Sequence, residues 1–234
     1  MPRPRLRTMF QDKNDWPETI KHLIWLEEHT CIKHRVAYIH HLNCYEREYP
    51  NTEFTEKIGF LDIEATNLKA DFGIVICYCL KPAKAKKVIT RCVTPYELRN
   101  CFDKEVILHL IKRIKKFDRI ITHYGKRFDL PFVRSRALNL GVDFPIHKFV
   151  WQTDTWEIAR SKLCISSNRL GNIANFLGIR QQKTPITSQH WLGALMGRRE
   201  SLDYIVDHCQ RDVLILEKVY NRICEFAPKS KVSI

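Results

Sequence analysis

The sequence predicts an α/β protein built on one mixed sheet with helices on its faces. Three strand-length apolar segments follow one another, and helical and strand segments then alternate, an order typical of a mixed five-stranded sheet. Apolar residues make up 44% of the 234 residues, enough for one sizeable core and a small appendage. We therefore expect a main domain at residues 56–234 and a small amino-terminal segment, containing cysteine and histidine, at residues 1–55.

The amino-terminal segment divides into three parts. Residues 1–15 are polar and basic, which favours disorder. Residues 16–29 carry apolar side chains at helical spacing and predict a helix. Residues 45–56 are polar and include Pro50, so we expect a linker that ends near residue 55.

The main domain is predicted from its apolar periodicity. Strands are expected at residues 57–64, 73–82, 86–93, 118–124 and 147–153, and helices at residues 103–117, 130–140 and 166–178. A last helix has apolar residues separated by three, four and seven positions: Leu202, Ile205, Val206, Cys209, Val213 and Leu216. Asp154 closes the last strand, so we expect it to cap the next helix, with a supporting role near bound metals as the alternative.

Four acidic residues lie beside apolar segments that should be buried: Asp62, Glu64, Asp129 and Asp212. A buried carboxylate is costly unless a cation or hydrogen bonds satisfy it. Side chains alternate along a strand, so Asp62 and Glu64 point the same way. Asp129 follows strand 118–124, at the carboxyl end where open α/β sheets place their ligand crevice. The pattern indicates a metal site.

His208 lies four residues before Asp212, so both project from one side of the last helix. Mg²⁺ and Mn²⁺ prefer oxygen ligands, and two such ions about 3.5 to 4 Å apart activate a water and stabilise the leaving oxygen of a phosphodiester. Histidine titrates near neutral pH and is suited to orienting or deprotonating that water. We expect two ions on the four acids, with His208 beside them.

Three motifs then resemble a known superfamily. FLDIEATNLKADFG, THYGKRFDLPFVRSRAL and HCQRDVLILEKVY are similar to the motifs of the DEDD (DnaQ-like) 3′-to-5′ exonucleases, and most similar to the YprB-like ribonuclease H-like proteins of prokaryotes and their viruses. The resemblance covers roughly residues 56–222. It implies a ribonuclease H-like fold, two divalent metals on Asp62, Glu64, Asp129 and Asp212, and hydrolysis from a 3′ end of nucleic acid. We expect single-stranded DNA as the favoured substrate, with RNA as the alternative.

The spacing of the histidine departs from both branches of that superfamily. One branch has a histidine five residues before the last aspartate, and the other has a tyrosine four residues before it. Here His208 has the tyrosine spacing and Asp207 the histidine spacing. Five residues rotate a side chain by about 140° relative to Asp212 and four by about 40°. We assign His208 to the water, and the subclass stays open.

The basic character of the chain predicts a nucleic-acid partner. The net charge is +13 and the pI about 9.4, which favours a polyanion. Basic residues gather at positions 3–7, 81–87 and 112–116, although we expect the last of these to be a solvated helix face. The candidates for direct contact are Tyr124, stacking on a base, and Lys126, Arg127, Asn168 and Arg169 on phosphates. Phe128 is expected in the core.

A second metal site is predicted near the amino terminus. Cys31 and His34 form a C-x2-H pair, and His41 and Cys44 form an H-x2-C pair, which suits tetrahedral Zn²⁺. His40 is an alternative to His41, and a histidine-rich stretch that merely contains two thiols is the competing interpretation. A structural zinc would help to fold a segment with so little core of its own.

The remaining composition bears on the compartment and on alternative functions. The nine cysteines are odd in number, and neither a secretory signal nor a membrane-spanning run is evident. We expect a soluble cytoplasmic protein that is largely free of disulfides. An endonuclease acting on RNA or an RNA/DNA hybrid, and a non-catalytic nucleic-acid-binding protein with a zinc knuckle, are the alternatives to the exonuclease.

Overall fold

The central sheet confirms the predicted mixed architecture. The computed structural model describes residues 18–49, 56–144, 150–180, 185–227 and 232–233. Within these residues the sheet has the order β3-β2-β1-β4-β5-β6. The five expected strands are β1 (Ile58–Ala65), β2 (Val75–Pro82), β3 (Ile89–Cys92), β4 (Arg119–Thr122) and β5 (Trp151–Asp154). A two-residue strand, β6 (Val232–Ser233), pairs antiparallel with β5 at the edge.

Strand direction decides where functional side chains gather. β1 pairs antiparallel with β2 and parallel with β4, and β4 pairs parallel with β5. The carboxyl ends of β1, β4 and β5 therefore meet at one edge of the sheet. Residues that follow these three strands are brought together there, which is the usual place of a ligand site in an open α/β sheet.

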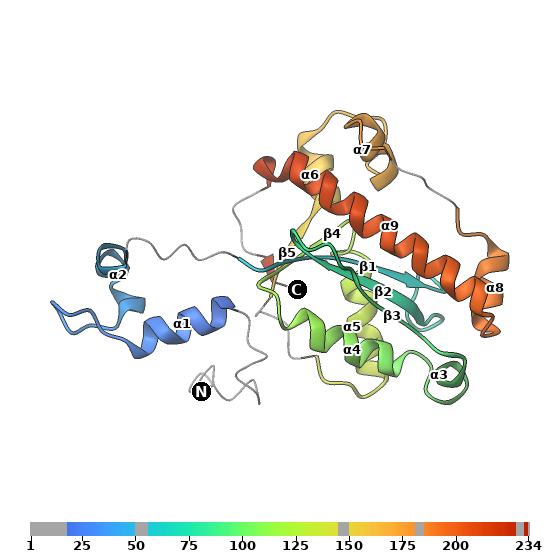
Figure 1. Ribbon diagram of the computed structural model, residues 1–234, viewed down its shortest axis with the longest axis horizontal. Coiled ribbons are helices and arrows are strands. Elements are labelled where there is room, and N and C mark those ends of the chain that lie inside the picture. Colours follow the sequence, from blue (N-terminus) through green and yellow to red (C-terminus); the bar gives the residue numbers. More distant parts are fainter. Residues whose placement is uncertain (1–17, 50–55, 145–149, 181–184, 228–231, 234) are drawn as a thin grey trace.

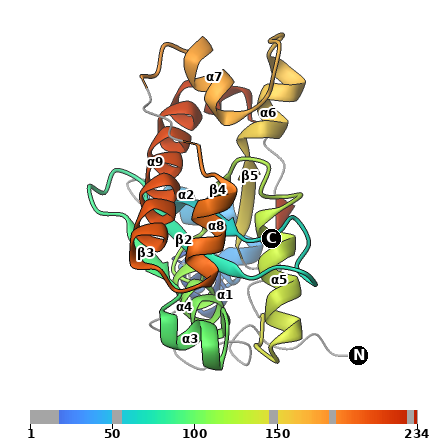
Figure 2. The ribbon, with the colours of Figure 1, turned by 90° about the vertical axis from the view of Figure 1, so that its right-hand side faces the viewer.

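Helices cover both faces of the sheet. Figures 1 and 2 show α4 and α5 on one face and the long α9, with α6, α7 and α8, on the other. The helices of this domain are α3 (Pro95–Asn100), α4 (Lys104–Ile114), α5 (Asp129–Asn139), α6 (Thr155–Lys162), α7 (Leu170–Phe176), α8 (Ser188–Leu195), α9 (Arg199–Ile223) and the short η4 (Cys224–Phe226). One apolar cluster joins β1 and β2 to α4, α5 and α9, and a second joins β1 and β4 to α6, α7 and the carboxyl half of α9.

Several element boundaries differ from the expectations. Two short helices, α3 and α8, were not predicted from the sequence. They begin after Thr94 and Thr187 with capping boxes. The helix expected from residue 166 begins only at Leu170, because Arg169 is extended, with ψ 141°. Its expected end is correct: Gly178 has φ +70°, the left-handed conformation that terminates helices.

The amino-terminal segment has a small core of its own. It contains α1 (Glu18–Glu28), η3 (Tyr38–His40) and α2 (Leu42–Glu48), and Figure 1 shows it beside the sheet body. Its core cluster consists of the buried residues Leu26, Cys31, Tyr38 and Cys44, and Ile20 and Ile24 of α1 are buried too. The linker predicted from residue 45 is wrong for its first residues, since α2 continues to Glu48, where the Tyr45 ring packs near Trp25 and Tyr38. The predictions for residues 1–15 and for a boundary near 55 lie outside the described residues.

Candidate active site

β1 and α9 bring together three of the predicted acids and the histidine. Asp62 and Glu64 lie on the face of β1 that α9 covers, and the Cys209 thiol donates a hydrogen bond to the carbonyl oxygen of Asp62 at 3.4 Å. His208 Nε2 lies 3.8 Å from Glu64 Oε1 and 3.7 Å from Asp212 Oδ2. The imidazole is therefore held between carboxylates of a strand and a helix that are far apart in sequence.

The Asp129 carboxyl group joins these acids from α5. It is the first residue of α5 and is buried. The last paired residues of β1 and β4 are Phe60 and Ile121, so the amide of Ile63 lies beyond the parallel pairing. That amide donates to Asp129 Oδ1 at 3.1 Å. The hydrogen bond fixes Asp129 beside the strand that carries Asp62 and Glu64.

The acids repel one another in a partly buried setting. Burial raises the pKa of Asp62 well above its ordinary value, and the nearby charges of Glu64, Asp129 and Asp212 raise it further. Burial also raises the pKa of Asp129 to about 7, although its hydrogen bonds with backbone amides oppose the shift. Carboxylates that interact in this way favour protonation or a divalent cation. The all-oxygen donor set fits Mg²⁺ or Mn²⁺.

The geometry separates the two candidates for the water-orienting residue. His208 points toward Glu64 and Asp212. Asp207 is exposed and pairs with Arg211 on the outer surface of α9. Of the two, the helix places His208 at the acids and Asp207 away from them.

The turn after β4 presents the first group of candidates for nucleic-acid contact. Tyr124, Lys126 and Arg127 are exposed there, and Lys126 Nζ pairs with Glu157 at 3.1 Å. Phe128, by contrast, packs against the main apolar cluster, as expected. The turn thus directs its polar side chains outward and its phenylalanine inward.

Asp154 caps α6, as the sequence predicts, and also holds the neighbouring turn. Its Oδ1 accepts from the amides of Trp156 at 2.9 Å and Tyr124 at 2.8 Å, and its Oδ2 accepts from the amide of Lys126 at 3.0 Å. Burial raises the pKa of Asp154, while these three backbone hydrogen bonds oppose the rise. One carboxylate therefore ties together the segments after β4 and β5.

Asn168 and Arg169 lie just before α7. Asn168 Oδ1 is buried, with no hydrogen-bond partner among the described residues, and Arg169 is exposed. In the described part of the chain no hydrogen bond or ion pair joins either residue to the four acids. Their contact with a substrate stays a prediction.

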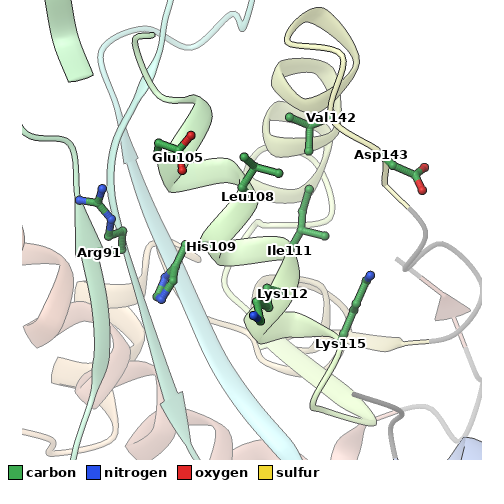
Figure 3. A pocket seen from close by; sticks show the side chains of 9 residues that line it. All are labelled: Arg91, Glu105, Leu108, His109, Ile111, Lys112, Lys115, Val142 and Asp143. Carbon is green, nitrogen blue, oxygen red and sulfur yellow. The ribbon is translucent and has the colours of Figure 1, made fainter. Parts of the chain in front are cut away.

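The basic segments are less uniform than the sequence indicated. Lys81 is buried and its Nζ lies 2.6 Å from Glu217 Oε2, so it does not belong to an exposed basic patch. Lys112 is exposed and lines a pocket of about 540 Å³ on α4, together with Arg91 and His109 (Figure 3). Acidic residues line this pocket too, and none of the site candidates does.

The amino-terminal cysteines and histidines converge as predicted. Among the described residues, Cys31, His34, His41 and Cys44 form the one group in which three or more potential ligand atoms all lie within 4.8 Å of one another; the four acids are spread more openly. His41, rather than His40, belongs to this group. Cys31 Sγ lies 3.3 Å from His41 Nδ1 and 3.6 Å from His34 Nδ1. Cys44 Sγ lies 3.5 Å from His34 Nδ1.

The environment of Cys31 favours its thiolate. Burial acts to raise the pKa of the thiol, but hydrogen bonds from His41, His34 and backbone amides outweigh it and lower the pKa to about 6. A thiolate is the form that binds a metal. The donor set of two sulfurs and two imidazoles is one that tetrahedral zinc uses.

Trp156 and Arg160, which lie beside this edge of the sheet, were not among the functional residues predicted from the sequence. They lie in α6, and Arg160 Cζ is 5.0 Å from the centroid of the Trp156 ring. Their spacing of four after a predicted strand end was the available signal, but only the folded chain places them next to Tyr124 and Arg127.

Comparison with known proteins identifies the class to which this fold and site belong. A family model described as the RNase_H superfamily matches residues 59–224, more than half of the chain. The chain belongs to the RNase H superfamily.

Among solved structures, the family B DNA polymerase from the hyperthermophilic archaeon Pyrobaculum calidifontis is similar, with a TM-score of 0.58 and 17% identity. The match covers 71% of this chain and 25% of the polymerase chain, so this chain spans about a quarter of that protein. At this identity the likeness is one of fold alone. No curated protein matches the chain.

No helix in the described residues is long and apolar enough to cross a membrane.

Proposed function

We propose that this protein is a divalent-metal-dependent nuclease that removes nucleotides from the 3′ end of a nucleic acid, and that it belongs to the YprB-like group of DEDD exonucleases. One observation carries the proposal: four acids from β1, α5 and α9 interact electrostatically around Asp62, with His208 within 4 Å of two of them. Membership of the RNase H superfamily supports nucleic acid as the substrate.

Each residue has a distinct part in the proposed reaction. Asp62, Glu64, Asp129 and Asp212 would hold two Mg²⁺ or Mn²⁺ ions. When bound, such ions activate the attacking water and stabilise the leaving oxygen. His208 would accept the proton of that water, a role supported by the position of its Nε2 within 4 Å of the Glu64 and Asp212 carboxylates. Asp129 is positioned by the Ile63 amide, so the backbone of β1 orients an acid that belongs to α5.

The experiment uses end-labelled single-stranded DNA, RNA, duplexes and a circular single strand, each with Mg²⁺ or Mn²⁺. We expect digestion of linear single strands from the 3′ end, with no cutting of the circle. Asp62→Ala and Glu64→Ala should abolish digestion without preventing binding. Cutting of the circle, or of an RNA/DNA hybrid at internal positions, would favour the endonuclease, and binding without digestion by the wild-type protein would favour the non-catalytic alternative.

The assignment of His208 has a matched control in the same helix. His208→Ala should lower the rate by about 10²- to 10⁴-fold, the usual contribution of general base catalysis. Asp207→Ala, one position along and facing solvent, should leave the rate unchanged. Equal losses in the two variants would contradict the assignment.

We also propose that Cys31, His34, His41 and Cys44 bind one structural Zn²⁺. The four buried residues of the amino-terminal core include two of these ligands, so a metal would supply much of the stability that the segment lacks. Residues 18–49 contain four lysines and arginines against five glutamates. This balance favours a folding role over an electrostatic grip on nucleic acid.

A further inference from the structure

An aromatic and cationic group lies next to the proposed active site. The ring of Trp156, in the first turn of α6, has Arg127 Cζ 5.3 Å and Arg160 Cζ 5.0 Å from its centroid. The Tyr124 ring lies 5.0 Å away at 73°. We call Tyr124, Arg127, Trp156 and Arg160 the Trp156 platform. Two guanidinium groups and a second aromatic ring thus surround one indole.

The topology places this platform beside the four acids. β1, β4 and β5 are parallel neighbours, so the segments that follow them lie in sequence along one edge of the sheet. β4 leads to Tyr124, Arg127 and then Asp129, and β5 leads to Asp154 and Trp156. Asp154 fixes both segments through its hydrogen bonds with the amides of Tyr124 and Trp156.

Core packing does not account for the platform. Tyr124 is 42% exposed, and its backbone has φ +66°, a conformation that non-glycine residues adopt rarely. Arg127 and Arg160 are exposed. Throughout the described chain no carboxylate lies within 4.0 Å of either guanidinium. These cations rest on an aromatic face, and no acid among the described residues neutralises them.

We propose that the Trp156 platform binds a single strand of nucleic acid next to the cleavage site, by stacking of bases on its rings and by contact of its two arginines with phosphates. This inference rests on the proposed nuclease function and names the part of the surface that selects the substrate. Aromatic side chains stack on any unpaired base, and guanidinium groups bind phosphate and stack as well. Bases in a duplex are already stacked on one another, so the platform favours single strands without preference for sequence.

The test measures binding separately from cleavage. In an Asp62→Ala background, a short fluorescein-labelled oligodeoxynucleotide is titrated by fluorescence anisotropy at several salt concentrations. Trp156→Leu should weaken binding by roughly 5- to 100-fold, as loss of base stacking does, with little change in salt dependence. Arg127→Ala and Arg160→Ala should each reduce the slope of log K against log salt by about 0.7, the contribution of one phosphate contact to a single strand.

Conservative and distant variants separate stacking from folding. Trp156→Phe should retain most of the affinity, since it keeps a ring. Tyr96→Ala and Arg99→Ala on α3, which both ribbon views show far from α6 (Figures 1 and 2), should bind as the parent does. Unchanged affinity in Trp156→Leu, or equal losses in Trp156→Leu and Trp156→Phe, would overturn the proposal. So would unaltered salt slopes in both arginine variants.

The two proposals fail in different ways. If the wild-type protein cleaves 3′ ends while the platform variants bind and cleave normally, only the platform is wrong. If the wild-type protein cleaves nothing, the nuclease function fails, and the binding measurement still decides whether the platform takes single strands. In otherwise active protein, Trp156→Leu should raise KM for a single-stranded substrate by a similar factor and change kcat little.

Discussion

The positions of the Asp62 and Asp129 carboxyl groups suit the proposed metal binding but lower the stability of the metal-free protein. Asp129 is buried and Asp62 is half-buried, both lie near other acids, and the pKa of each is raised. Without a cation, folding must therefore either keep a proton on these groups or hold negative charges together in a poorly solvated place. Sites of this kind lower the stability of the empty protein and gain stability when the ion binds.

The pH dependence of stability follows from the direction of these shifts. The pKa of Asp129 rises from 3.8 to about 7 on folding, so the native state binds more protons than the unfolded state between these values. The free energy of unfolding of the metal-free protein should then fall as pH rises from about 4 to 7, by on the order of 4 kcal/mol from Asp129 alone.

Asp62→Asn tests this account. The variant removes one of the repelling charges, so metal-free Asp62→Asn should be more stable than wild type at pH 8 and nearly equal to it at pH 5, while losing digestion. Thermal unfolding of the two proteins measures the difference, and Mn²⁺ should raise the melting temperature of wild type more than that of the variant. Asp207→Asn, an exposed acid, is the control. An identical pH dependence of the melting temperature in all three proteins would contradict the explanation.

The turn between β4 and α5 shows how one short element positions an acid. Gly125 is buried in this turn, and an added Cβ would lie 2.4 Å from Thr122 Cβ. The Gly125 carbonyl also accepts a hydrogen bond from the Leu130 amide at 3.0 Å, next to Asp129. The close approach of the turn to the end of β4 requires glycine here, because any side chain would displace the start of α5.

Gly125→Ala should therefore affect both stability and activity. Overpacking of this sort costs roughly 1–3 kcal/mol, and displacement of Asp129 should lower the digestion rate by more than the loss of folded protein explains. Gly141→Ala is a suitable control: its backbone has φ +64°, but nothing lies within 4 Å of the added Cβ. That variant should lose stability through backbone strain alone and retain its rate. Chemical denaturation and single-turnover digestion measure the two effects.

The amino-terminal segment and the sheet domain have separate apolar clusters. The family match begins at residue 59, after the Cys/His group. We therefore expect loss of the proposed zinc to unfold residues 18–49 while the sheet domain keeps its structure, since zinc ligation would supply folding energy to the small cluster only.

The Cys31→Ser variant tests whether the segment binds zinc and which part of the chain the zinc stabilises. Wild-type protein should contain about one zinc per chain, and its cobalt form should show thiolate absorption; the variant should lose both. Hydrogen exchange should increase within residues 18–49, with the melting transition of the sheet domain unchanged. Cys164→Ser, at an exposed thiol, is the matched control, and His34→Ala a second ligand variant. Zinc retained in both ligand variants, or absent from wild type, would contradict the site.

The positions of the strands along the chain and the facing of the acids on β1 and α9 were largely predictable. Alternation along β1 correctly put Asp62 and Glu64 on one side, and helical spacing correctly put His208 with Asp212 on the inner side of α9. Short helices such as α2 and α8 were not predictable, because seven or eight residues carry too little periodicity and depend on contacts made elsewhere.

What the sequence alone determined is local: periodicity, caps and motif spacing fix which side of a strand or helix each residue faces. The folded chain decided which of those sides meet. Asp103 and Arg136 form a buried ion pair at 2.7 Å, Lys81 turns inward to Glu217, and Trp156 comes to lie against Arg127. No local pattern marks these pairs, since each joins segments whose proximity depends on strand order and on the packing of separate helices against one sheet.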